Sequence, residues 1–229
     1  MSAGYPFAAP GRDTTREELV RSTAAKAAES LDLRLQVLER FGPSLVACAG
    51  AMAAAFRAGG TLLAFGNGGS STDAQSVAQL FLTPGRGGRQ LPAISLTGDS
   101  ALLTALANDV HFDVVFARQL AALGRRGDIA VALSTSGGSA NVLQGLQAAR
   151  RAGMVTVGFA GSGGGRMAGE ALADHLFVVP SSSVHRIQEA QTTLRHVLWE
   201  LVQHELAGTG SDRAGSDRAG SDRAGSDRA

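Results

Sequence analysis

Five short, largely apolar stretches recur along the second part of this chain, and each is followed at once by Gly, Ser, Thr or Pro. They lie at 61–65, 91–96, 128–133, 154–160 and 175–179. Continuous rather than alternating hydrophobicity is typical of strands that are buried on both faces, as in a parallel sheet covered by helices. Helical patterns separate the runs, so the sequence predicts an α/β fold in which right-handed crossovers build a doubly wound sheet.

Helical patterns also flank this alternating region. The pattern over 14–57 begins with threonines and glutamates that are typical of a helix start. Because Pro43 lies inside it, we expect an interruption there and a second helix over 43–58, which ends at two glycines. A last helix is predicted over 184–206.

The length of 229 residues suits one domain with a sizeable core. The chain ends in four copies of Gly-Ser-Asp-Arg-Ala from Gly210 to Ala229, which have no apolar side chain larger than Ala. Such a tail cannot bury enough surface to offset its ordering entropy. We therefore expect a flexible N-terminus at 1–13, one domain over 14–207 and a disordered tail over 208–229.

Charge and cysteine content exclude several classes of protein. Lys plus Arg is 21 against 20 for Asp plus Glu, and this balance is unlike the basic surface of a nucleic-acid-binding protein, so no direct nucleic-acid partner is expected. A single cysteine, Cys48, excludes a disulfide framework and a cysteine-based zinc cluster. Without a membrane-length apolar run or a signal-peptide pattern, we expect a soluble cytoplasmic protein with no membrane partner.

Two strand ends carry loops rich in glycine and hydroxyl groups. The first strand leads into 66–73 and the third into 134–141, and each loop precedes a helix. In a parallel sheet, ligands bind beyond the carboxyl ends of the strands, where helix N-termini present unpaired amides. Glycine lets the backbone approach a ligand, and the hydroxyls add donors, so the pair predicts a phosphate site without lysine. Well-capped turns are the alternative interpretation.

Other nucleotide-binding motifs fit the sequence poorly. A dinucleotide fingerprint that starts at Gly66 would need glycine where Ser71 stands. A P-loop needs Gly-Lys-Ser/Thr, and the chain's lysine, Lys26, lies in the N-terminal helix. The stretch 161–166 also lacks the last glycine of the fingerprint, so we interpret it as a turn that could face the ligand. A nucleotide-dependent oxidoreductase is therefore disfavoured.

Taken together, the loops resemble the sugar isomerase (SIS) domain family, and within it the phosphoheptose isomerase branch, over about Thr61 to Leu206. Several ordered motifs carry this resemblance: Gly66-Asn67-Gly68-Gly69-Ser70, Ala107-Asn108-Asp109, Ser134-Thr135-Ser136-Gly137 with Ser139-Ala140-Asn141, Gly164-Gly165-Arg166-Met167-Ala168-Gly169 and Arg186-Ile187-Gln188-Glu189.

The resemblance implies a five-stranded parallel sheet flanked by helices, a homotetramer and a phosphorylated sugar such as sedoheptulose 7-phosphate as ligand. Ser134, Thr135, Ser136 and Ser139 match the family's phosphate cradle. Asn67, Ser70, Asp109 and Gln188 match residues that bind the rest of the sugar, and His196 matches a catalytic histidine of the last helix. Gln188 and His196 are eight residues apart, a little over two turns, so they share one helix face.

Two departures concern the family's zinc site and catalytic carboxylate. The family's metal-ligating His corresponds to Ser76 and its Glu to Leu80, which leaves Gln188 and His196 of four ligands. Because zinc needs three or four good ligands, no metal or other cofactor is expected. Gln75 and Gln79 lie nearby, but an amide is no base near neutral pH. His185 is a conceivable replacement imidazole.

Two functional hypotheses follow. The first is a ketose/aldose isomerase, an intramolecular oxidoreductase that retains His196 and takes its second proton-transfer group from elsewhere. The second is a catalytically silent sugar-phosphate sensor or assembly partner, like the SIS protein that binds the bacterial replication initiator. Since the phosphate cradle is complete and the acid–base helix is depleted, the sequence favours ligand binding over turnover.

Overall fold

The computed structural model describes residues 15–85 and 87–216, and at its centre is a five-stranded parallel sheet. The strands lie in the order β2-β1-β3-β4-β5, and every neighbouring pair is parallel. Their bounds are β1 Leu62–Gly66, β2 Ala93–Ser95, β3 Ile129–Ser134, β4 Val155–Gly161 and β5 His175–Val179. The predicted α/β class and all five strands are confirmed, although β2 is shorter than its apolar run.

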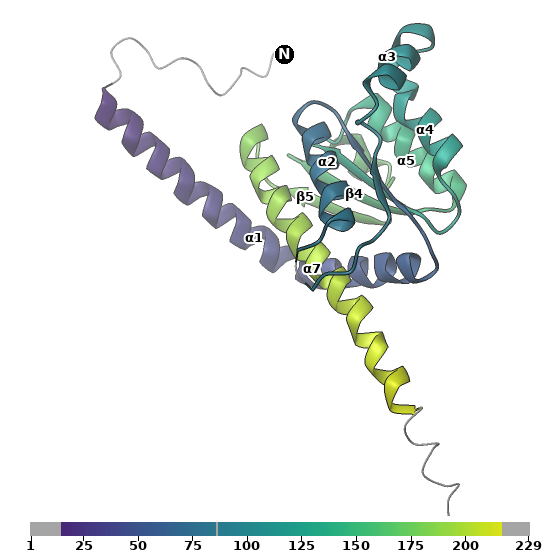
Figure 1. Ribbon diagram of the computed structural model, residues 1–229. Coiled ribbons are helices and arrows are strands. Elements are labelled where there is room, and N and C mark those ends of the chain that lie inside the picture. The colour runs from purple at the N-terminus through teal and green to yellow at the C-terminus, as the bar shows by residue number, and fades with distance from the viewer. Residues whose placement is uncertain (1–14, 86, 217–229) are drawn as a thin grey trace, which may run out of the picture.

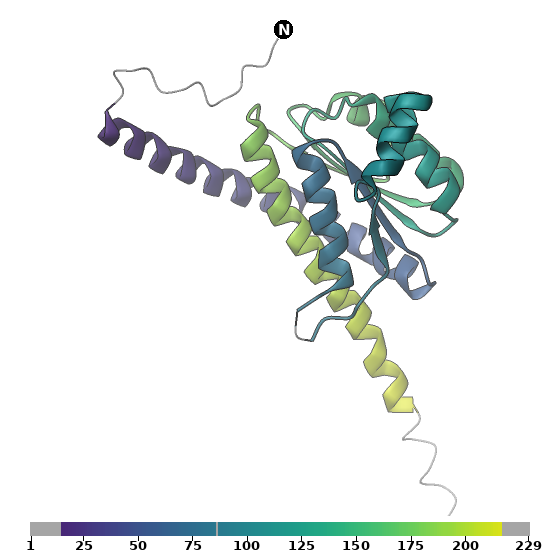
Figure 2. The same ribbon diagram turned by 45° about the horizontal axis from the view of Figure 1, so that its top comes forward.

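Helices cover both faces of the sheet, which gives three layers (Figures 1 and 2). One face is covered by α1 (Arg16–Arg57), α2 (Gly69–Leu82) and α7 (Val184–Ser216). The other face is covered by α3 (Ser100–Asp109), the short 3₁₀ helix η1 (Phe112–Val114), α4 (Val115–Leu123), α5 (Ala140–Ala152) and α6 (Gly165–Gly169).

Each strand contributes to two cores because successive side chains point to opposite faces. In β1, Leu62 and Ala64 pack with α1, α2 and α7, whereas Leu63 and Phe65 pack with α4 and α5. All four side chains are almost inaccessible to solvent, and burying one side chain of leucine or phenylalanine size contributes about 1.5–3 kcal/mol. Strands buried on both faces explain why the apolar runs are continuous.

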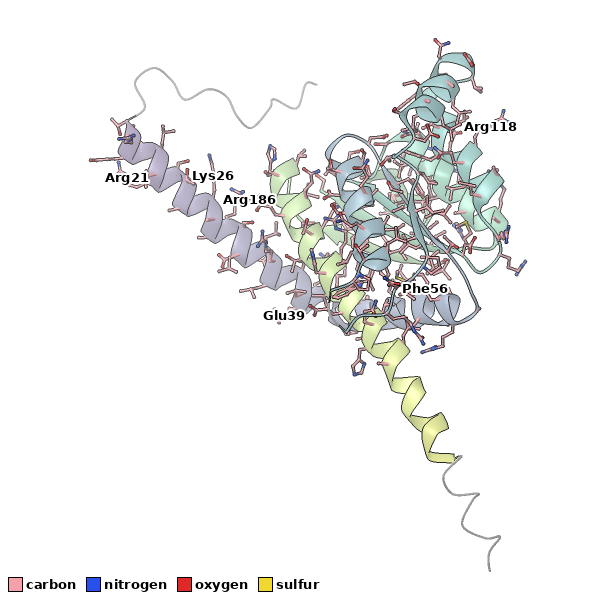
Figure 3. The ribbon with its side chains drawn as sticks, viewed as in Figure 1. Arg21, Lys26, Glu39, Phe56, Arg118 and Arg186 are labelled. Atoms are coloured by element: carbon pink, nitrogen blue, oxygen red, sulfur yellow. The ribbon has the colours of Figure 1, made fainter. Side chains whose placement is uncertain are left out.

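The N-terminal helix α1 is one continuous element, and the predicted interruption at Pro43 is wrong. The helix starts as expected, with Thr15 as N-cap in a capping box with Glu18. Proline removes one helical hydrogen bond and kinks a helix more often than it ends it when both sides are packed. Phe41 and Leu45 are both buried beside Pro43, and the axis changes direction between Glu39 and Phe56 (Figure 3).

Burial also determines the chemistry of Cys48 in α1. The side chain is fully buried in the core, and burial raises the pKa of its thiol to about 12. It is the inert, small apolar side chain that the sequence indicates.

The C-terminal helix α7 continues to Ser216, beyond the predicted end at Leu206. The stretch 208–216, which we expected to be disordered, is therefore helical. Serine, aspartate, arginine and alanine propagate an existing helix at small cost, and an internal glycine costs only about 1 kcal/mol. The predictions for 1–13 and for 217–229 lie outside the described residues. Within those described, no helix has both the length and the apolar composition to cross a membrane.

Candidate functional site

The two glycine- and hydroxyl-rich loops leave the same edge of the sheet, side by side. β1 and β3 are neighbours, and Gly66 at the end of β1 is in register with Leu133 in β3. The first loop leads into α2 at Gly69, and the second leads into α5 at Ala140. Both loops therefore lie at the carboxyl ends of adjacent strands, where an α/β sheet binds its ligands.

A reciprocal pair of hydrogen bonds joins the two loops. The Asn67 side-chain amide donates to Oδ1 of Asn141 at 2.8 Å, and the Asn141 amide donates back to Oδ1 of Asn67 at 2.8 Å. Asn141 is only 2% exposed and its Oδ1 also accepts from the Val142 backbone amide at 3.0 Å. This pair fixes the position of one loop relative to the other.

Three serine hydroxyls of the second loop gather at the N-terminus of α5. The Ser134 hydroxyl oxygen lies 3.4 Å from those of Ser136 and Ser139. The backbone amides of Gly137 and Gly138 donate to the hydroxyls of Ser134 and Ser136 at 3.1 and 3.2 Å. Ser139 is the N-cap residue of α5, but its side chain makes no capping hydrogen bond, so the amides of the first turn are not satisfied by this hydroxyl.

The loop after β4 packs beneath the second loop. Gly137 has a φ of +62°, and a β-carbon there would overlap the Gly164 carbonyl oxygen. The Met167 amide donates to the Gly137 carbonyl at 2.9 Å. Only glycine meets both the positive φ and the close backbone approach. The stretch 161–166, predicted as a turn, therefore supports the second loop through its backbone.

On the opposite side of the first loop, Gln188 of α7 packs against the N-terminus of α2. Its side-chain amide occupies the space where a β-carbon of Gly69 would lie. The same amide donates to the Asp73 carboxylate at 3.4 Å. The last helix is thus in direct contact with the first loop, as the resemblance implies.

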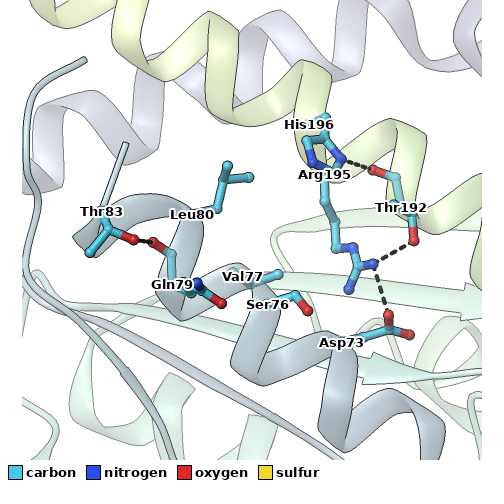
Figure 4. A pocket seen from close by; sticks show the side chains of 9 residues that line it. All are labelled: Asp73, Ser76, Val77, Gln79, Leu80, Thr83, Thr192, Arg195 and His196. Carbon is cyan, nitrogen blue, oxygen red and sulfur yellow. Dashed lines mark hydrogen bonds and ion pairs between the residues drawn. The ribbon is translucent and has the colours of Figure 1, made fainter. Parts of the chain in front are cut away.

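A cavity of about 370 Å³ lies between α2 and α7 (Figure 4). The residues lining it are Asp73, Ser76, Val77, Gln79, Leu80, Thr83, Thr192, Arg195 and His196. Nδ1 of His196 lies 2.8 Å from the Thr192 carbonyl oxygen. Because a carbonyl only accepts, Nδ1 carries the hydrogen, and Nε2 is the basic nitrogen of the neutral ring. The second loop does not line this cavity.

A buried ion pair spans the cavity from α7 to α2. Nη2 of Arg195 donates to Oδ1 of Asp73 at 2.9 Å and to the Thr192 hydroxyl at 2.7 Å. Burial lowers the pKa of the Arg195 guanidinium and the Asp73 carboxylate opposes that shift, so the group remains charged. The sequence analysis did not single out this pair. Its one signal is that Gln188, Thr192 and Arg195, spaced by four and three residues, share a helix face.

Some predicted site residues lie apart from these contacts. Asp109 is exposed at the end of α3, which stands away from α2 and α7 in Figure 1, and its carboxylate accepts from the neighbouring Asn108 side chain at 2.8 Å. Thr135 is half-buried between the first two serines of its loop, whereas Ser70 is only 4% exposed in the first turn of α2. No recorded hydrogen bond joins Asp109 to either loop among the described residues.

The cavity walls do not fit a zinc ion. The Ser76 hydroxyl donates to the Thr72 carbonyl at 3.0 Å, and Leu80 offers no ligand atom. Among residues 15–85 and 87–216, no group of three or more His, Cys, Asp or Glu side chains could hold a metal ion.

Comparison with known proteins agrees with this architecture. Residues 27–161 match the SIS domain, so the chain belongs to the SIS domain family. Within that family it is of the phosphoheptose isomerase type. It is 46% identical to the phosphoheptose isomerase of Roseiflexus sp. (strain RS-1) over 181 residues, which span 77% of this chain and 89% of that protein.

Two solved structures show the same relationship. A phosphoheptose isomerase from Neisseria gonorrhoeae is 37% identical with a TM-score of 0.75, and the match covers 80% of this chain and 98% of that one. A phosphoheptose isomerase from Francisella tularensis is 30% identical with a TM-score of 0.77, and the match covers 81% and 98% of the two chains.

Proposed function

We propose that this protein binds a phosphorylated sugar of the sedoheptulose 7-phosphate kind and that the second loop holds the phosphate. The single observation that carries this proposal is the convergence of the Ser134, Ser136 and Ser139 hydroxyls at the N-terminus of α5. Hydroxyls, backbone amides and the helix dipole together bind an anion without a lysine. The names of the relatives supply the sugar class.

The non-phosphate end of the sugar is assigned to the first loop and to α7. Asn67 lies in the first loop and is held in place by Asn141. Gln188 reaches the same loop from α7, where it lies against Gly69. Ser70 and Thr135 remain predicted contacts of the two loops. Asp109 would have to be supplied from a neighbouring subunit, or by a movement of α3, to contact the same ligand.

Binding without efficient isomerisation is the activity that the cavity supports best. Moving a carbonyl between adjacent carbons requires a base to remove a proton and an acid to return it. Asp73 is the one carboxylate among the described residues that line the cavity, and it is already engaged in an ion pair with Arg195. The protein is thus proposed to be a sugar-phosphate sensor or assembly partner.

Isomerase activity is the second candidate function, and Nε2 of His196 is the observation that favours it. This nitrogen is unprotonated in the neutral ring and belongs to a residue that lines the cavity. A coupled assay that follows conversion of sedoheptulose 7-phosphate to its aldose isomer separates the two candidates. We expect no turnover above the background rate. Turnover that is abolished by His196→Ala would establish the isomerase instead.

The purified protein is proposed to work without zinc, because the residues at 76 and 80 cannot ligate it. Elemental analysis should find less than about 0.1 zinc per chain, since a structural or catalytic site is normally filled. Stoichiometric zinc that is removed by a chelator would contradict this proposal.

A homotetramer in the cytoplasm is proposed from the family relationship. The apolar side chains exposed on the first half of α1, namely Leu19, Val20, Leu31 and Leu35, support association with further copies. Light scattering of the purified chain should give four times the mass of 23.4 kDa, and a monomeric mass would contradict it.

Isothermal titration with sedoheptulose 7-phosphate tests the main proposal. Replacing Ser134 and Ser136 by alanine should weaken binding at least 10-fold, because hydrogen bonds to a charged group contribute about 1.5–3 kcal/mol each. The matched control is Thr23→Ala, whose hydroxyl is exposed on α1 and is engaged with its own helix. Equal affinities of the serine double variant and the wild type would reject the phosphate assignment.

A further inference from the structure

An unpaired nitrogen of Arg195 is the feature of the cavity that the proposed function does not yet use. The residue is only 6% exposed, and both of its recorded hydrogen bonds come from Nη2. Nη1 is buried and has no hydrogen-bond partner among the described residues. Figure 4 shows the side chain extending from α7 across the cavity towards Asp73 and Ser76 on α2.

A buried donor without a partner is unfavourable enough to need an explanation. Leaving such a group unpaired costs about 1–3 kcal/mol, and more when the group is charged. Most buried polar groups in native proteins are therefore paired with protein, water or ligand. Arg195 lines a cavity of about 370 Å³, so a ligand that enters this cavity can supply the missing acceptor once a neighbouring side chain moves aside to expose Nη1.

The charge balance of the cavity indicates which kind of acceptor fits. Asp73 lies 2.9 Å from Nη2, so the pair carries no net charge. A second full negative charge would gain little from a guanidinium that is already compensated, and it would be repelled by Asp73. A neutral oxygen, such as a hydroxyl or carbonyl, needs only the one available hydrogen-bond donor.

The cavity also adjoins the first loop. Asp73 lies three residues beyond Ser70 in α2, a rise of about 4.5 Å along the helix axis. Gln188 contacts both Gly69 and Asp73, so its side chain bridges the first loop and the Asp73–Arg195 ion pair. A sugar whose phosphate is held at Ser134 and whose chain passes Asn67 is directed towards this cavity.

We propose that Nη1 of Arg195 donates a hydrogen bond to a hydroxyl or carbonyl oxygen at the non-phosphate end of the sugar. The protein thus binds that oxygen with a fixed guanidinium, held in place by Asp73 and Thr192, instead of with a metal ion. The role is one of binding and specificity: Arg195 distinguishes a long sugar phosphate from phosphate alone. This inference rests on the proposed sugar-phosphate function.

The test compares the binding of two ligands to the Asp73→Asn single variant and to the double variant that also carries Arg195→Met. Because Arg195→Met alone would leave the Asp73 carboxylate uncompensated, it is combined with Asp73→Asn. The matched control is Arg186→Met, which removes another α7 arginine, one that forms ion pairs with Glu29 of α1 and with Glu189 of α7 itself. Thermal unfolding checks that each variant is folded, and titration calorimetry then measures sedoheptulose 7-phosphate and inorganic phosphate separately.

The double variant should bind sedoheptulose 7-phosphate about 10- to 100-fold more weakly than the Asp73→Asn single variant, because a charged hydrogen bond is lost. Inorganic phosphate should bind all variants equally within about twofold. An unchanged sugar-phosphate affinity would overturn the role of Arg195 and leave the proposed function standing, provided that the serine double variant still loses binding. No binding of either ligand to the wild type would overturn the proposed function itself.

A second measurement on the wild type keeps the inference testable if the double variant does not fold. In protein labelled with ¹⁵N-arginine, the Arg195 guanidinium resonances should shift when sedoheptulose 7-phosphate is added and should not shift with inorganic phosphate. Unshifted resonances at saturating sugar phosphate, or equal shifts with both ligands, would overturn the proposal.

Discussion

The two loops and the α2–α7 cavity are built in opposite ways. The loops contain short uncharged groups that satisfy one another, as the Asn67–Asn141 pair and the Ser134 cluster show. The cavity contains a buried ion pair and a donor without a partner. In the proposed function the loops bind the anion, whereas the cavity offers a buried hydrogen-bond donor that has no partner among the described residues.

Under the proposed function, this difference separates phosphate binding from carbonyl chemistry within one chain. The phosphate site depends on backbone amides and glycines, which a side-chain substitution on a helix does not disturb. The proposed chemistry would depend on individual side chains of α2 and α7, and the resemblance places Ser76 and Leu80, which both line the cavity, at two of those positions. The groups for carbonyl chemistry can therefore be lost or altered while the phosphate-binding loops stay intact.

The largest expected effect comes from Gly137→Ala, which tests whether the loop geometry is as tightly determined as we infer. The positive φ and the overlap with Gly164 should together lower the free energy of unfolding by about 2–6 kcal/mol. Urea unfolding measures this loss. Gly59→Ala is the matched control, because Gly59 has a φ of +87° but open space around it, so only about 1–2 kcal/mol should be lost. Equal losses would show that the close packing is unimportant.

A smaller effect is expected from Asn141→Ala, which separates the two loops. The amide of Asn67 loses its partner, so stability should fall by about 1–3 kcal/mol and sugar-phosphate affinity by about 10-fold. Gln203→Ala is the control: it removes two amide hydrogen bonds to the Arg89 backbone, at 2.8 and 3.0 Å, in an exposed position. If both variants bind the ligand like the wild type, the link between the loops has no role in binding.

The smallest effect is predicted for Arg166→Ala in the supporting loop. Its ion pair with Glu170 at 2.7 Å is exposed, and such pairs contribute no more than about 0.5 kcal/mol. Because this loop acts through its backbone, ligand affinity should stay within about twofold. A 10-fold loss in calorimetry would instead make the Arg166 side chain part of the site and weaken the contrast between loops and cavity.

The sequence predicted those features that depend on local pattern. Continuous apolar runs gave the strands, and glycines and serines after two of them gave the loops. Pro43 shows the limit of prediction from local pattern. Its local preference favoured a break in the helix, but tertiary packing kept α1 continuous. The end of α7 shows the same limit, since a packed helix continues into residues that would not form one alone.

Pairings between distant residues could not be predicted from one sequence. Asp73 and Arg195 are 122 residues apart, and Asn67 and Asn141 are 74 apart. Whether such side chains meet depends on how far each helix is rotated about its axis, and no local pattern fixes that rotation. Asp109 illustrates the converse, because a residue that matches a family motif makes its recorded side-chain hydrogen bond with its neighbour Asn108 and not with either loop.

The central claim is that the second loop holds the phosphate and the α2–α7 cavity receives the other end of the sugar. A crystal structure of the protein soaked with sedoheptulose 7-phosphate tests it most directly. We expect phosphate density within hydrogen-bond distance of the Ser134, Ser136 and Ser139 hydroxyls. We also expect a sugar oxygen within hydrogen-bond distance of Nη1 of Arg195. Phosphate density in the cavity beside Arg195, with the Ser134 loop unoccupied, would contradict it.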